Sequence, residues 1–116
     1  MRNHKGLRAF ELADDLAIAV YRATELFPRE EQFGLKSQLR RAAVSVASNI
    51  VEGCARQSQA DYVRFLDIAL GSACEVEYQI SLAQRLGYIE QSLSDEVVQT
   101  ASETARVLNG LIRSLR

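Results

Sequence analysis

Apolar residues recur at three- and four-residue steps in four separate stretches of the chain. This spacing places them on one face of an α-helix. The pattern predicts helices at about residues 7–26, 30–55, 59–86 and 94–115. Four amphipathic helices with short connections favour an all-α, antiparallel up-down four-helix bundle. The alternative is a looser three-helix core with a docked fourth helix.

Local signals mark the expected helix ends. Pro28 separates the first two helices, because proline cannot continue a helix without losing a backbone hydrogen bond. Ser58 and Asp61 have the spacing of a capping box, and Gly87 suits the left-handed position that follows a helix. Ser94 is expected to start the fourth helix, followed by acidic residues at its positive end.

The second and third predicted helices carry apolar residues on a second face, away from the main stripe. A helix that is apolar on two sides has to bury both of them. We therefore expect self-association through a contact surface made of Val44, Val51, Ile68, Leu82 and Leu86. The alternative is that the first and fourth helices cover both faces.

Small residues cluster on the same two helices. Gly71 lies in the middle of the third, where glycine costs about 1 kcal/mol relative to alanine. A close backbone approach would explain this cost, so we expect one at Gly71. The alternative is an exposed glycine under weak constraint.

A polar stripe also follows the second helix. It is either a solvated face or a buried hydrogen-bonded network that sets the register of the second and third helices. In the second case the network would consist of Arg41, Ser45, Asn49, Glu52, Ser72 and Glu75.

The length of 116 residues fits a single domain, 1–116, and the net charge is −1. The charge is unevenly distributed, since residues 29–64 carry six basic and four acidic side chains, and residues 65–116 four basic and seven acidic. A surface that binds nucleic acid would therefore lie on the second helix and its flanks. Its expected contacts are Lys36, Arg40, Arg41, Arg56 and Arg64. The alternative for these residues is ordinary solvated charge and salt bridges.

Catalytic signatures are missing from the sequence. The single histidine, His4, lies in an N-terminal segment that we expect to be frayed, and there is no glycine-rich phosphate loop. Cys54 and Cys74 are expected to be small core residues rather than a disulfide or metal ligands. We expect no enzymatic activity, no cofactor, no metal and no small-molecule substrate.

No apolar run approaches the roughly 20 residues that span a bilayer, so we expect no membrane association. The first residues lack the apolar stretch of a signal peptide, and the expected location is the cytoplasm.

The segment from Phe27 to Ser72 resembles a bacterial family of four-helix-bundle proteins first noted in open reading frames within intervening sequences of 23S ribosomal RNA genes. The block RRAAVSVASNIVEG, residues 40–53, is specific. Further matching residues are Phe27-Pro28, Gly34-Leu35, Gln38, Arg56, Phe65-Leu66, Ala69, Gly71-Ser72 and Glu75. The accessory variability protein of diversity-generating retroelements is similar to this family.

The resemblance implies an antiparallel four-helix bundle that assembles as a ring-like homopentamer without enzymatic activity. It also implies association with RNA or a ribonucleoprotein, since the retroelement relatives are thought to bind a reverse transcriptase and nucleic acid through a basic surface. This chain departs from them in being mildly acidic. Two functions therefore stay open: an RNA-associated homo-oligomer, and a protein-binding scaffold with no nucleic-acid role.

Overall fold

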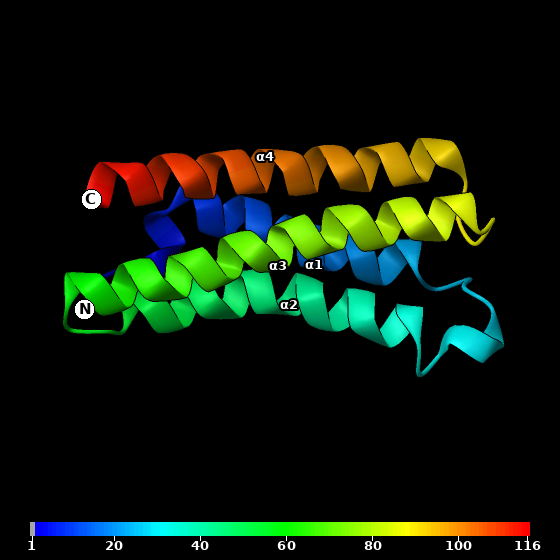
Figure 1. The fold of residues 1–116 in the computed structure, drawn as a ribbon, viewed down its shortest axis with the longest axis horizontal. Helices are drawn as coiled ribbons and strands as arrows, with labels where there is room; N and C mark the ends of the chain where they lie inside the picture. The colour runs from blue at the N-terminus through cyan, green and yellow to red at the C-terminus, as the bar shows by residue number, and fades with distance from the viewer. Residues whose placement is uncertain (1) are drawn as a thin grey trace.

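The computed structural model describes residues 2–116, which form four long α-helices (Figure 1). The helices are α1 (Arg8–Ala23), α2 (Leu35–Cys54), α3 (Gln59–Arg85) and α4 (Gln91–Leu115), with short 3-10 helices η1 (His4–Gly6) and η2 (Arg29–Glu31). Successive helices run in opposite directions along a long axis of 43 Å. The predicted all-α, four-helix fold is confirmed.

The four helices share one core. Each contacts two neighbours, in the order α1, α2, α3, α4 and back to α1. The fully buried side chains come from all four helices and include Leu16, Leu39, Leu66 and Leu108. Because α4 packs along both α1 and α3, the alternative of a three-helix core with a docked fourth helix is wrong.

The connection between α1 and α2 is longer than the apolar pattern predicts. Helix α1 ends at Ala23 rather than near residue 26, and α2 begins at Leu35 rather than at residue 30. The Glu31 carboxylate causes the late start, because its Oε1 accepts a hydrogen bond from the Leu35 backbone N–H at 2.9 Å. A Cβ on Gly34 would lie 2.6 Å from this same oxygen, so a larger residue there would displace the Glu31 carboxylate from its present position.

The turn between α3 and α4 has the predicted glycine. Gly87 has φ of +81°, and the N–H groups of Gly87 and Tyr88 bond back to the carbonyls of Gln84 and Ala83, which is a Schellman motif. Helix α4 begins at Gln91, three residues earlier than the predicted start near Ser94. Ser94 is buried one turn inside the helix, on the same inward-facing side as Val97.

The other end of the bundle holds the N-terminal segment. Ser58 caps α3 as predicted, with its hydroxyl accepting from the Asp61 N–H at 3.1 Å. The expectation of a frayed segment around His4 is wrong: the Arg2 N–H bonds to the Cys54 carbonyl at 3.0 Å, and the His4 and Phe10 rings lie 4.7 Å apart.

A close approach of α3 to α2 occurs at a different glycine from the one we predicted. A Cβ on Gly71 would have nothing within 4 Å, so the predicted approach there is wrong within this chain. A Cβ on Gly53 would lie 3.0 Å from Phe65 Cβ and 3.2 Å from Tyr62 Cδ1. The two helices lie close together at Gly53 because only four residues, 55–58, connect the end of α2 to the start of α3.

Candidate functional site

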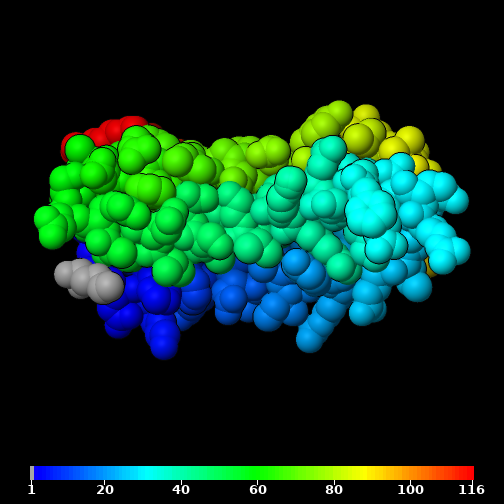
Figure 2. Space-filling view, turned by 90° about the horizontal axis from the view of Figure 1, so that it is seen from below, coloured from blue at the N-terminus to red at the C-terminus, as the bar shows by residue number. Residues whose placement is uncertain are grey.

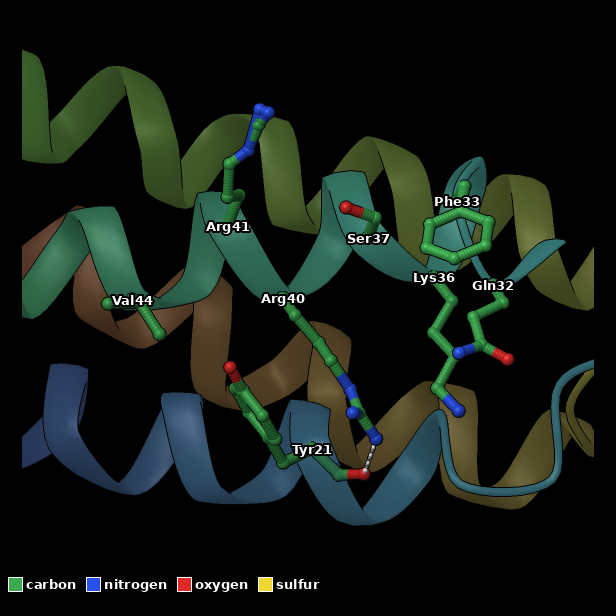
Figure 3. Close-up of a pocket in the computed structure, with 8 residues that line it drawn as sticks. All are labelled: Tyr21, Gln32, Phe33, Lys36, Ser37, Arg40, Arg41 and Val44. Atoms are coloured by element: carbon green, nitrogen blue, oxygen red, sulfur yellow. Dashed lines mark hydrogen bonds between the residues drawn. The ribbon is translucent and has the colours of Figure 1, made fainter.

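A cleft of about 440 Å³ opens between the C-terminal half of α1 and the start of α2 (Figure 3). Three of its eight lining residues are cationic and none is acidic, in a protein whose net charge is −1. The lining residues are Tyr21, Gln32, Phe33, Lys36, Ser37, Arg40, Arg41 and Val44. The cleft therefore combines positive charge with aromatic surface.

Arg40 is held in place by α1. Its Nε donates to Thr24 Oγ1 at 2.9 Å, and its Nη2 donates to the Tyr21 carbonyl at 3.1 Å. The buried Thr24 hydroxyl donates in turn to the Val20 carbonyl at 2.8 Å, which leaves its lone pairs for the guanidinium. The guanidinium also lies over the Tyr21 ring, 4.3 Å from its centroid. Arg40 thus links the two helices as well as lining the cleft.

Lys36 and Arg41 lie on either side of Arg40 and point in different directions. In Figure 3, Lys36 extends toward the cleft beside Gln32, whereas Arg41 leaves α2 on the opposite side, toward α3. Within residues 2–116, neither cation has a carboxylate within salt-bridge distance. Both charges are therefore available to an anion.

Phe33 displays its ring almost completely to solvent, with 92% of the side chain exposed. It stands on the turn after η2, which forms one end of the face seen in Figure 2, in cyan. The turn is braced by Glu31, whose second oxygen accepts from the Tyr88 hydroxyl at 3.1 Å. This bond raises the pKa of Tyr88, because ionising the phenol beside a carboxylate is unfavourable.

The five predicted basic contacts do not form one surface. Lys36, Arg40 and Arg41 gather at the cleft, but Arg56 and Arg64 lie near the opposite end of the bundle. Arg41 is about 20 Å along the helix axis from Cys54, the last residue of α2, at 1.5 Å per residue, and Arg56 lies beyond that end. Both distal guanidinium groups lie over Phe65, at 5.0 and 4.9 Å, and each is within 4 Å of a carboxylate, on Glu52 and Asp61 respectively. We therefore restrict the candidate site to the first three.

Comparison with known proteins identifies the family. The family described as 23S rRNA-intervening sequence protein matches residues 5–110. The chain belongs to this family. It is also similar to a solved structure from Bacteroides thetaiotaomicron, a protein of unknown function from the S23 ribosomal protein family. The identity is 26% over 90% of this chain and 95% of that one, with a TM-score of 0.83. Among curated proteins nothing matches.

Part of the predicted polar network of this family member forms. Ser45 and Ser72 share a hydrogen bond of 2.9 Å between their hydroxyls, and Asn49 Nδ2 donates to the Ser45 carbonyl and hydroxyl at 2.8 and 2.9 Å. Arg41, Glu52 and Glu75 stay exposed and outside this set, so the larger network is wrong. The longer side chains extend into solvent, while the short side chains of Ser45 and Ser72 meet between α2 and α3.

One buried polar residue between α2 and α3 was not predicted from the sequence. Gln79 is 92% buried, and its Oε1 has no hydrogen-bond partner among the described residues. It lines a groove of about 360 Å³ together with Gln38, Arg41, Ala42, Ser45, Ser72 and Glu75. The only signal in the sequence is its place three residues after Val76 and seven after Ser72, which puts it beside the α2 contact.

The second apolar faces are exposed in the single chain. Val44, Val51, Ile68 and Leu86 keep 38–53% of their side chains accessible, so α1 and α4 do not cover them. Leu82 differs, because it is half-buried and packs against the core. Whether another molecule covers these faces stays a prediction.

The two cysteines have different surroundings. Cys54 is buried, which raises the pKa of its thiol, and burial likewise raises the pKa of the neighbouring Tyr62. Cys74 is exposed, so the prediction that both are core residues is wrong for it. It lies on the outer side of α3, one position beyond the stripe residue Ala73.

Residues 2–116 contain no group of three or more His, Cys, Asp or Glu side chains placed to hold a metal ion. Among the described helices, none combines the length and the apolar character that crossing a bilayer requires.

Proposed function

We propose that this chain is a non-enzymatic accessory protein that binds RNA through the α1–α2 cleft and acts as a homo-oligomer. The cleft carries the proposal, since Lys36, Arg40 and Arg41 line it beside Tyr21 and Phe33 with no carboxylate among them. Phosphate contacts dominate nucleic-acid affinity, and aromatic rings add sequence-tolerant stacking. Membership of a family named for 23S rRNA-intervening sequences is consistent with a role near RNA.

The overall charge of −1 opposes binding to a polyanion, so the local field has to dominate. A cleft lined by one sign of charge focuses the field at its mouth. Repetition of the cleft around an oligomer would present several such fields to one RNA. Self-association therefore strengthens the RNA proposal, although each can be tested separately.

We expect RNA to be retained at low salt and released as salt rises. The double substitution of Lys36→Gln and Arg41→Gln should weaken binding at least about tenfold and lower the salt slope by about 2, because two phosphate contacts are lost. Both side chains reach solvent, so folding should be unaffected. Filter binding or anisotropy measured against salt concentration gives both quantities.

A matched control replaces Arg106 and Arg113 of α4 by glutamine. It removes the same charge from a helix that does not line the cleft. If this control weakens binding as much as the cleft variant, the RNA contacts lie elsewhere. The absence of any RNA binding at about 50 mM salt would overturn the proposal.

For the oligomer, we expect light scattering to give a solution mass that is a multiple of the 12.9 kDa chain. Ile68→Asp should reduce this mass, because it places a charge on a surface that association would bury. Leu93→Asp is the control, since Leu93 is similarly exposed but lies on α4. A stable monomer at micromolar concentration would contradict self-association.

The second candidate is a protein-binding scaffold. Leu26, which is 93% exposed at the same end of the bundle as Phe33, favours it together with the uncovered faces of α2 and α3. Capture of a protein partner that persists after nuclease treatment, without RNA binding by the purified chain, would support this scaffold instead.

A further inference from the structure

We propose that the cleft takes an unpaired nucleotide of RNA, with its base stacked on the Phe33 ring and its phosphate against Lys36 and Arg40. This inference rests on the proposed RNA binding and goes further, because such a cleft would select single-stranded over duplex RNA. Three features of the cleft support it: an aromatic ring on a braced turn, an oriented cation with unused donors, and dimensions that suit one nucleotide.

The ring of Phe33 stands on a turn whose backbone is braced. Three interactions hold the turn that carries it: Glu31 accepts from the Leu35 N–H at 2.9 Å and from the Tyr88 hydroxyl at 3.1 Å, and the Phe27 and Tyr88 rings lie 5.7 Å apart. Nevertheless the phenyl ring itself is 92% exposed. A turn that is anchored in this way presents an open aromatic face at little further cost in conformational entropy.

The cation opposite this ring is oriented in advance. Arg40 donates one hydrogen bond from Nε to the Thr24 hydroxyl and one from Nη2 to the Tyr21 carbonyl. A guanidinium has five N–H donors, and the Nη1 group of Arg40 takes part in no hydrogen bond within the described chain. These donors are therefore available to a ligand. Lys36 extends into the same space, as Figure 3 shows. A phosphate there would meet one fixed and one mobile cation.

The dimensions favour a single nucleotide. A volume of about 440 Å³ falls in the range of small-molecule sites, and the Gln32 amide on its wall can donate to or accept from a base edge. A base in a duplex has both faces covered by its neighbours, so it cannot stack on Phe33 without being extruded. The cleft should therefore discriminate against paired RNA.

The test compares the binding of the full chain to an oligouridylate of about 12 nucleotides, its abasic counterpart and an RNA duplex of the same length. Phe33→Leu keeps an apolar side chain but removes the aromatic face. We expect it to weaken oligouridylate binding about 5- to 100-fold and to leave duplex binding unchanged. Phe33→Trp should bind oligouridylate at least as well as the natural chain does. The abasic strand lacks bases to stack, so its affinity for the natural chain should not exceed the affinity of oligouridylate for Phe33→Leu.

Leu26→Ala is the matched control, because this residue is 93% exposed near the same end of the bundle but does not line the cleft. Equal oligouridylate binding by the natural chain and Phe33→Leu would overturn the proposed stacking of a base on Phe33. This holds even if Lys36→Gln weakens binding, a result that would support only the phosphate contact. Equal affinity of the natural chain for duplex and single strand would also overturn the proposed stacking. If no RNA binds at about 50 mM salt, the proposed function itself fails.

Discussion

Replacement of Gly53 by valine is expected to lower the free energy of unfolding by about 2–3 kcal/mol, because the space beside it is already filled. A Cβ at this position would lie 3.0 Å from Phe65 Cβ and 3.2 Å from Tyr62 Cδ1, and valine adds two further methyl groups. Tyr62 is 97% buried and cannot swing aside. Urea unfolding at a fixed protein concentration measures the change.

Gly71→Ala is the matched control for this substitution. It lies in the interior of α3 with nothing within 4 Å of an added Cβ, so alanine should stabilise the chain by about 0.5–1 kcal/mol through helix propensity. A stabilising Gly53→Val would contradict the close packing of α2 on α3. A destabilising Gly71→Ala would mean that another molecule approaches the outer side of α3.

The second large effect is expected from Leu66→Ala, which should cost about 2–5 kcal/mol. Leu66 is fully buried on the inner face of α3, so truncation leaves a cavity that the surrounding helices cannot easily fill. Because small domains are stable by only about 5–15 kcal/mol, this is a substantial part of the total. The same unfolding measurement applies.

Ile68→Ala provides the comparison two residues further along. Ile68 keeps 43% of its side chain exposed, so its truncation should cost less than about 1 kcal/mol if the chain is measured as a monomer. A loss as large as that of Leu66→Ala, and dependent on protein concentration, would show that association buries Ile68. Equal and small losses at both positions would contradict the assignment of Leu66 to the core.

The fold could be predicted because its signals are local. The stripe that includes Leu39, Val46 and Ile50 faces inward as expected, since a period of 3.6 residues determines which side chains share a helix face. The caps at Ser58 and Gly87 were recognisable for the same reason, because each depends on a few consecutive residues. The start of α2 was missed because it depends on a hydrogen bond from the Leu35 N–H to the Glu31 carboxylate, which the apolar periodicity does not reveal.

The candidate site could be predicted only in part. Lys36, Arg40 and Arg41 could be grouped on α2 because they are close in sequence. The block that contains the two arginines also pointed to the family. Tyr21 and Phe33 were not assigned to the site. Tyr21 joins it through the packing of α1 against α2, and Phe33 through the braced turn that precedes α2.

By itself, the sequence determined the number of helices, their inner faces and the family of this protein, because periodicity, caps and motifs are properties of neighbouring residues. The tertiary structure decided which residues from different helices meet: Arg40 with Thr24, Ser45 with Ser72, and Gly53, rather than Gly71, with the facing helix. It also separated Arg56 and Arg64 from the cleft. The physical reason is that such meetings depend on the rotation and axial shift of one helix against another, which the packing of the whole core sets.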